Sequence, residues 1–132
     1  MSALDALVRL GSTTLDVEAE LRRSFARLWV ARSATTICAF LLAWDVADEV
    51  HLLDLVVAPA ARRRGIARGL LTTLIAHARE RRAGWILLEV RASNLAARRL
   101  YEQVGFFPDG ERAGYYSDGE DAVLMRFDLG AC

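Results

Sequence analysis

The sequence predicts a single domain, residues 1–132, of mixed α/β (α+β) class, built on one sheet whose strands run in both directions. Three observations indicate this class. Apolar, β-rich segments come first and are separated by short polar turns, as in antiparallel strands. Two segments with the apolar period of a helix follow, each flanked by strand-like segments. The 132 residues are 54% hydrophobic and 26% charged, which suits a soluble domain with its own core.

The N-terminal part predicts a helix and a hairpin. Residues 16–25 read as a short helix capped by Asp16, with one apolar face made by Val17, Leu21 and Phe25. Residues 27–32 and 35–44 are apolar and rich in β-forming side chains. The polar residues between these two segments predict that they form an antiparallel hairpin.

A third strand and a long helix follow. The strand of residues 48–59 is expected to end at Pro59, and the other proline, Pro108, is also expected at a strand end, because proline cannot donate a ladder hydrogen bond. From Gly65 the period becomes helical, with a buried face made by Ile66, Leu70, Leu71, Leu74, Ile75 and Ala78. Gly84 is expected to end this helix.

The remaining elements are a strand, a second helix and a final strand. Residues 85–90, WILLEV, are almost continuously apolar, which is typical of a strand buried in a parallel sheet. Asn94 is expected to cap a helix that runs to about Gln103, with Gly105 just past its end. A polar segment then leads to the apolar residues 122–127, the last predicted strand.

Composition excludes several classes of protein. The formal net charge is zero, whereas nucleic-acid-binding modules usually carry a basic excess, so no nucleic-acid partner is expected. The sequence shows neither a signal peptide nor an apolar run of membrane-spanning length, so we expect a cytoplasmic protein without a membrane partner. Cys38 and Cys132 have no metal-ligand spacing, and Cys38 is expected to be a small core residue. No metal is expected.

The stretch APAARRRGIA, residues 58–67, places three arginines directly before a predicted helix. The first turn of a helix leaves backbone N–H groups unpaired, and the helix dipole favours an anion there. Small residues such as Gly65 and Ala67 allow phosphate oxygens to approach the backbone, and arginines add forked donors. The alternative is a solvated basic cluster. The stretch lacks both the G-x-G-x-x-G pattern and the lysine of a Walker loop.

RRRGIA resembles the Arg/Gln-x-x-Gly-x-Gly/Ala pyrophosphate loop of the GNAT acetyltransferases. Residues 87–106, LLEVRASNLAARRLYEQVGF, closely resemble the RimI-type ribosomal-protein alanine N-acetyltransferases of that family, as does the later YYSDGEDAVLM. The resemblance covers roughly Asp54 to Phe127. It implies the GNAT fold, a central mixed, mostly antiparallel sheet with a parallel splayed pair and flanking helices. It also implies acetyl-CoA as the cosubstrate and the arginine stretch as its anion cradle.

The resemblance implies roles for individual residues. Glu89 matches the general base of the family and Tyr101 its general acid. The positions that match coenzyme contacts are Leu55, Val56, Val57, Arg62, Arg63, Arg64, Gly65, Ile66, Ala67, Arg68 and Asn94. A backbone N–H near Val57 is expected to meet the oxyanion.

The residue pattern leaves alternatives open at both catalytic positions. Glu89 lies in an apolar run, where an inward carboxylate is costly unless it has a catalytic role or a partner. The alternative is an outward, solvated side chain. Tyr101 follows Asn94 by seven residues, two helical turns, so both can face one side. The alternative for Tyr101 is a core tyrosine that packs beside Leu100.

The acceptor is the least determined partner. Tyr115 and Tyr116 lie among Asp118, Glu120 and Asp121, in a region that borders the acceptor peptide in the resembling family. These acidic residues suit a basic peptide or a polyamine, or they form a solvated loop. His51 and His77 show no partner pattern and are expected to be structural or exposed.

The expected activity is N-acetylation of a protein N-terminus, such as that of a ribosomal protein. The alternatives are a small-amine acetyltransferase acting on a polyamine, amino acid or aminoglycoside, and a non-catalytic CoA-binding regulatory module. The N-terminal part shows no match to the substrate-shaping segment of the family. The acceptor and the oligomeric state therefore stay open.

Overall fold

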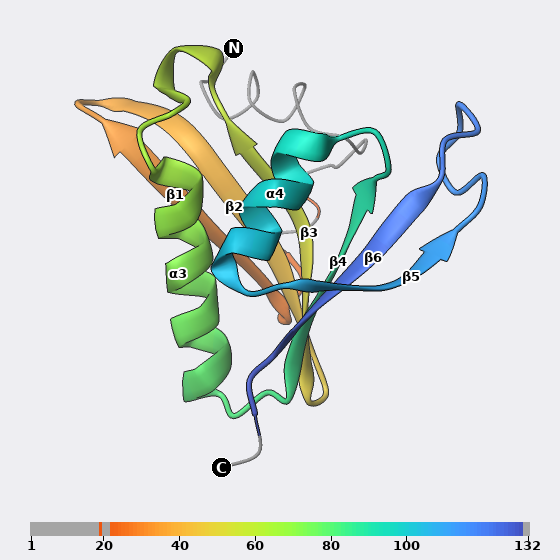
Figure 1. The fold of residues 1–132 in the computed structure, drawn as a ribbon. Helices are drawn as coiled ribbons and strands as arrows, with labels where there is room; N and C mark the ends of the chain where they lie inside the picture. Colours follow the sequence, from red (N-terminus) through yellow and green to blue (C-terminus); the bar gives the residue numbers. More distant parts are fainter. Residues whose placement is uncertain (1–18, 20–21, 131–132) are drawn as a thin grey trace.

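In the computed structural model, which describes Ala19 and residues 22–130, six strands form one sheet in the order β1-β2-β3-β4-β6-β5 (Figure 1). The elements in chain order are β1 (Ala26–Ser33), β2 (Thr36–Val46), β3 (Glu49–Val57), the 3-10 helix η1 (Pro59–Ala61), α3 (Ile66–Glu80), β4 (Trp85–Arg91), α4 (Leu95–Val104), β5 (Phe107–Arg112) and β6 (Ala122–Asp128). Half of the expected helix over residues 16–25 lies outside the described residues; Ala19 is helical, but residues 22–25 form the turn before β1, so the helix does not reach Phe25 as expected.

The sheet is mixed, as expected. Neighbouring strands are antiparallel except for β3 and β4, which are parallel. Their pairing covers only residues 49–52 against 85–88, and beyond these residues the two strands diverge (Figure 1). α3 and α4 lie side by side on one face of the sheet, and Arg68 on α3 donates to Gln103 on α4 over 2.9 Å. This arrangement confirms the predicted sheet with a splayed parallel pair and flanking helices.

The main core lies between the sheet and the two helices. The predicted face of α3 is buried at Leu70, Leu71, Leu74 and Ala78. These side chains belong to the same buried cluster as Ile86 and Leu88 of β4. β4 is parallel to β3, as predicted, but its alternate residues are only half-buried. Successive side chains of a strand point to opposite faces, and Trp85, Leu87 and Glu89 lie on the face that α3 and α4 do not cover. Cys38 is buried, as predicted.

α3 ends at Glu80, earlier than the predicted stop at Gly84. Arg82 adopts a left-handed φ of 60°. The backbone N–H of Ala83 donates to the carbonyl of Ala78 and that of Arg82 to the carbonyl of Arg79. This is the Schellman arrangement, which usually has glycine where Arg82 stands. The sequence therefore lacks the glycine that would mark the end of this helix.

The predicted strand end at Pro108 is wrong, because β5 runs on to Arg112 and Pro108 lies inside it. All residues of β5 are exposed, so the segment lacks the apolar alternation that indicates a strand. β5 is the outer strand of the sheet, and its pairing with β6 is irregular between Pro108 and Glu111. Proline is tolerated at such edge and bulge positions.

The two histidines have carboxylate partners that the sequence did not indicate. His77 Nε2 lies 2.9 Å from Asp45 Oδ1, and His51 Nε2 lies 2.6 Å from Glu49 Oε2. Asp45 comes from β2 and His77 from α3, so only folding brings that pair together. Among the described residues, no helix is long and apolar enough to cross a membrane.

Gly105, the residue that ends α4, allows a test of how closely this helix packs against the sheet. Its φ is 127°, and an added Cβ would lie 2.8 Å from Cε2 of Phe127 on β6. We expect Gly105→Ala to lower the free energy of unfolding by about 2–4 kcal/mol, because backbone strain and overpacking add.

Gly119→Ala is the matched control, because Gly119 also has a positive φ, 87°, but open space around its Cα. We expect a loss of only about 1–2 kcal/mol there, from the backbone alone. Urea denaturation of the two variants makes the comparison. Equal losses would mean that the contact with Phe127 relaxes without cost.

Candidate active site

Two adjoining cavities open where β3 and β4 diverge. The narrow cavity has a volume of 260 Å³ and is lined by residues 52–57 of β3, Arg62, residues 89–91 of β4, Asn94, Ala97 and Tyr101. The wide cavity has a volume of 520 Å³ and is lined by Trp44, His51, Leu52, Leu53, residues 87–89, Asp109, Arg112, Tyr115, Tyr116, Leu124 and Met125. Glu89 is the one ionisable residue that lines both. Two ligands, one in each cavity, can therefore contact each other beside Glu89.

The candidate residues named from the sequence fall into two groups. Those that line the narrow cavity are Leu55, Val56, Val57, Arg62, Glu89, Asn94 and Tyr101. Those that lie outside its lining, on the loop before α3 and in the first turn of α3, are Arg63, Arg64, Gly65, Ile66, Ala67 and Arg68. The two groups are joined by Arg62, whose Nε donates to the carbonyl of Val57 over 3.1 Å.

The edge of β3 that faces the narrow cavity presents backbone groups. Ala58 donates its N–H to the carbonyl of Cys38 on β2 over 2.8 Å. Because successive backbone groups of a strand alternate in direction, the N–H groups of Leu55 and Val57 point away from β2, toward the side that β4 has left. The N–H of Leu55 donates to Oδ1 of Asp54 over 3.0 Å. An extended ligand can therefore lie along this edge, with the N–H of Val57 directed toward it.

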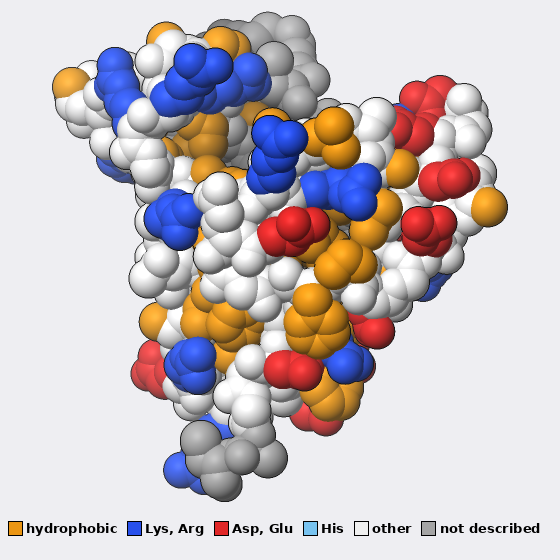
Figure 2. Space-filling view, viewed as in Figure 1, with side chains coloured by type: hydrophobic (Ala, Val, Ile, Leu, Met, Phe, Trp, Pro, Cys, Tyr) orange, Lys and Arg blue, Asp and Glu red, His pale blue; other side chains and the backbone are white. Residues whose placement is uncertain are grey.

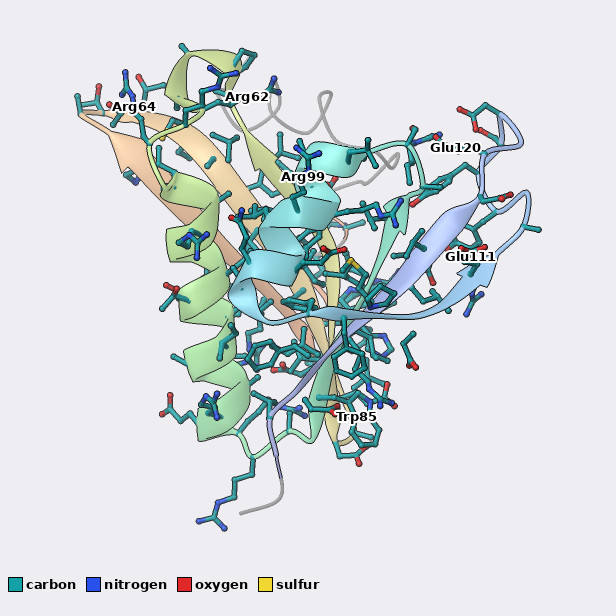
Figure 3. All side chains as sticks on the ribbon, in the orientation of Figure 1. Arg62, Arg64, Trp85, Arg99, Glu111 and Glu120 are labelled. Atoms are coloured by element: carbon teal, nitrogen blue, oxygen red, sulfur yellow. The ribbon has the colours of Figure 1, made fainter. Side chains whose placement is uncertain are left out.

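The start of α3 has the features of an anion site. Gly65 precedes the helix with a left-handed φ of 76°, no side chain caps the first turn, and none of its residues is acidic. Arg62, Arg63 and Arg64 are exposed beside it. Figure 3 shows Arg62 and Arg64 on the loop between β3 and α3, and Figure 2 shows basic side chains gathered at that end of the molecule. Unpaired N–H groups and the helix dipole favour a phosphate at this position.

Glu89 is neither buried nor freely solvated. Its side chain is 30% exposed, and Oε1 lies 3.8 Å from Nε of Arg112. The hydroxyl of Tyr115 donates a hydrogen bond to Glu89, which, together with burial, raises the pKa of Tyr115. The carboxylate is therefore accessible from both cavities and is held by a neutral donor and a cation.

Tyr101 both packs in the core and lines the narrow cavity, so its two alternatives are not exclusive. It is 7% exposed and makes an edge-to-face contact with Phe106, at 5.6 Å between ring centroids. Burial raises its pKa, and the charge of Asp54 raises it further, so the phenol stays protonated throughout the physiological range. Asn94 caps α4 as predicted, with Oδ1 accepting from the N–H of Ala97 over 3.2 Å.

Asp54 is an ionisable residue of the site that our reading of the sequence missed. It is 6% exposed and is the only buried polar or charged residue within the described part of the chain. Burial raises its pKa from 3.8 to about 6, although the hydrogen bond from Leu55 opposes the shift. The signal was present in the sequence: a carboxylate in the apolar run LLDLVV is as unusual as Glu89 in WILLEV.

The acidic residues between β5 and β6 have partners within the protein. Asp118 and Glu120 both accept from Arg91. Asp121 accepts from the backbone N–H of Gly114. The aromatic residues of the same loop, Tyr115 and Tyr116, line the wide cavity. The aromatic side chains, more than the carboxylates, are therefore available to a molecule in that cavity.

The chain matches known proteins in sequence and in structure. The family model described as "Acetyltransferase (GNAT) family" matches residues 6–106. Ribosomal protein bS18-alanine N-acetyltransferase of Escherichia coli is 42% identical over 96 residues, which cover 70% of this chain and 65% of that protein. N-alpha-acetyltransferase RimI of Mycobacterium tuberculosis is 47% identical over 83 residues, 62% of this chain and 49% of that one.

A solved structure supports the same relationship. The crystal structure of the Escherichia coli ribosomal-protein alanine N-acetyltransferase has a TM-score of 0.87 and 30% identity, covering 98% of this chain and 88% of that one. In the sequence comparison, the matched stretch spans just under two thirds of the Escherichia coli relative's length.

The buried carboxyl of Asp54 makes stability depend on pH. Its pKa rises from 3.8 to about 6 on folding, so the folded protein binds this proton more tightly than the unfolded chain does. The corresponding stability is complete below about pH 4 and is lost as the pH rises to about 6, at a cost of about 3 kcal/mol.

We therefore expect Asp54→Asn, which removes the charge and keeps an acceptor for Leu55, to raise the free energy of unfolding at pH 8 by up to about 3 kcal/mol and to change it little at pH 4. Urea denaturation at the two pH values measures the difference. Asp48→Asn, at an exposed position, is the control. A gain that is the same at both pH values would show that the charge of Asp54 is not the cause.

Proposed function

Because the chain belongs to the GNAT acetyltransferase family, we propose that it transfers the acetyl group of acetyl-CoA to an amine, the α-amino group at the N-terminus of a protein. The observation that carries this proposal is the placement of Glu89 at the junction of the two cavities with Tyr101 in the narrow one. The names of the relatives make a ribosomal protein with N-terminal alanine the first acceptor to test. Such an acceptor places the reaction in the cytoplasm.

The coenzyme fits the narrow cavity and the start of α3. We infer that its pyrophosphate binds the backbone of residues 64–68, assisted by the arginines from Arg62 to Arg64, since these groups lie at an uncapped helix N-terminus. The pantetheine arm then lies along the edge of β3, beside Leu55 and Val57. Asn94 supports the same arm from the start of α4. In this arrangement the thioester lies near Glu89 and Tyr101.

The reaction needs a base, an oxyanion donor and an acid. Glu89 accepts a proton from the acceptor ammonium, whose ordinary pKa is around 7.7–8.0, so a carboxylate suffices near neutral pH. The amine attacks the thioester carbonyl, and the N–H of Val57 donates to the oxygen as it gains charge. When the carbon–sulfur bond breaks, Tyr101 donates its proton to the sulfur, and the second proton that leaves the amide nitrogen restores the phenol. Burial of Tyr101 keeps the phenol protonated until the bond breaks.

The wide cavity supports a second candidate acceptor. Its volume of 520 Å³ is sufficient for a small-molecule amine as well as for the first residues of a peptide. A non-catalytic CoA-binding module is less favoured, because it needs neither Glu89 nor Tyr101 at the cavities.

The deciding experiment is an acetyl-CoA consumption assay against peptides that differ only in their first residue, with polyamines, amino acids and an aminoglycoside alongside. We expect peptides with a small first residue to be acetylated. Turnover only with a small amine would support the second candidate. Acetyl-CoA binding without turnover of any amine would leave only the non-catalytic module.

Glu89→Gln tests the proposed base. We expect a loss in turnover of about 10²–10⁴-fold near neutral pH and a smaller loss at high pH, where the acceptor amine is already deprotonated. Initial rates from pH 6.5 to 9.5 measure the effect. Glu80→Gln, at the exposed end of α3, is the control and should leave the rates unchanged. A loss independent of pH would assign Glu89 a structural role.

Tyr101→Phe tests the proposed acid while keeping the buried ring. We expect turnover to fall by roughly 10²-fold or more, with an unchanged melting temperature and unchanged affinity for acetyl-CoA. Thermal denaturation, calorimetry and single-turnover rates measure the three quantities. A lower melting temperature with nearly full activity would show that the hydroxyl satisfies a buried partner instead.

A further inference from the structure

Arg91 stands at the end of β4, two residues after Glu89, and lines the narrow cavity. No role was expected for it from the sequence. Its guanidinium reaches away from the strand to the segment of residues 113–121 between β5 and β6, which we call the tyrosine loop. The tyrosine loop carries Tyr115 and Tyr116, which line the wide cavity. Arg91 is thus placed between the two cavities.

The contacts of Arg91 to the tyrosine loop are close and of several kinds. Nη1 donates to Oδ2 of Asp118 over 2.8 Å and to Oε1 of Glu120 over 3.0 Å. The guanidinium carbon lies 4.1 Å from the centroid of the Tyr116 ring, within the range of a cation–π contact. A single side chain therefore engages both carboxylates and one aromatic ring of the loop.

Glu120 makes further contacts between the tyrosine loop and the chain after β4. Its Oε2 accepts from the backbone N–H of Ser93 over 2.9 Å, while Oε1 accepts from Arg91. The N–H of Ala92 donates to the carbonyl of Asp121 over 3.0 Å. The tyrosine loop is thereby attached to the turn between β4 and α4. Figure 3 shows Glu120 on this loop beyond the end of β4.

The attached loop ends at the proposed base. Tyr116 and Tyr115 meet edge to face at 5.1 Å between centroids. The hydroxyl of Tyr115 donates to Glu89. Contacts thus run from Arg91 through Tyr116 and Tyr115 back to Glu89, which lies two residues before Arg91 on β4. β5, the strand before the loop, is exposed throughout and pairs with β6 at the edge of the sheet.

We propose that Arg91 is a positioning residue for the acceptor: it holds the tyrosine loop so that Tyr115 and Tyr116 form the wall of the wide cavity beside Glu89. This inference rests on the proposed acetyl transfer. Arg91 acts through the loop and touches no reacting atom. Its loss should therefore impair the use of the acceptor and leave the binding of acetyl-CoA intact, although Arg91 lines the narrow cavity.

The test compares Arg91→Gln, Arg91→Lys and Arg32→Gln, an exposed arginine of β1 that serves as the control. Hydrogen exchange of peptides from residues 113–121 reports on the loop without any need for activity. Calorimetry gives the affinity for acetyl-CoA, and steady-state rates with a peptide beginning with alanine give KM and kcat.

For Arg91→Gln we expect faster exchange in the tyrosine loop, a KM for the peptide raised roughly five- to tenfold, and an unchanged affinity for acetyl-CoA, since loosened positioning weakens productive binding. Arg91→Lys should recover only part of the loss, because an ammonium cannot engage two carboxylates and a ring as a planar guanidinium does. Arg32→Gln should match the wild type in all three measurements.

A double-mutant cycle with Glu120→Gln identifies the route. If Arg91 acts through Glu120, the double variant should lose less than the sum of the two single losses in KM. Strict additivity would contradict that route.

Other outcomes overturn the proposal in distinct ways. Unchanged exchange in residues 113–121 would show that Arg91 does not hold the loop. Faster exchange with an unchanged KM would reduce its role to structure alone, and weaker binding of acetyl-CoA would assign Arg91 to the coenzyme. A wild-type protein that acetylates no amine would refute the proposed function, while the exchange measurement would still decide whether Arg91 holds the loop.

Discussion

The parallel pairing of β3 and β4, which stops after Leu52 and Leu88, is the constraint on which the rest of the structure depends. Unpaired backbone groups away from water are costly, so a sheet that opens in its middle needs partners for its free edges. Here, Asp54 and Arg62 supply two of these partners on β3. The gap is kept open because each strand is still paired on its other side, β3 with β2 and β4 with β6.

The gap also determines the electrostatic character of the site. Where the two strands separate, the side chains around the gap line a cavity. Asp54 of β3, Glu89 of β4 and Tyr101 of α4 line it at different depths. The deeply buried Asp54 and Tyr101 have raised pKa values because water is excluded from them. Glu89, at the junction with the wide cavity, keeps a side chain that is 30% exposed.

Arginine is the cation in each part of the site, and each arginine has a different setting. Arg62 donates to the backbone of β3, Arg91 holds the tyrosine loop, and Arg112 lies next to Glu89. The exposed arginines before α3 have a different setting, because the first turn of that helix contains no acidic residue. Their charge is therefore available to an anion. In the tyrosine loop, by contrast, the carboxylates already have hydrogen-bond partners within the protein. Net charge alone does not distinguish these settings.

The sequence by itself determined the elements that follow from local signals: the hairpin, the period of α3, the Asn94 cap of α4 and the family to which the chain belongs. These signals are carried by residues close together in the chain. It did not indicate the extent of β5, whose exposed residues show no alternation, or the end of α3, where Arg82 stands in a position usual for glycine. The pairs Asp45–His77 and Arg91–Glu120 join residues far apart in sequence. Only the tertiary structure decided them, because each depends on which strands lie side by side and where two of them separate.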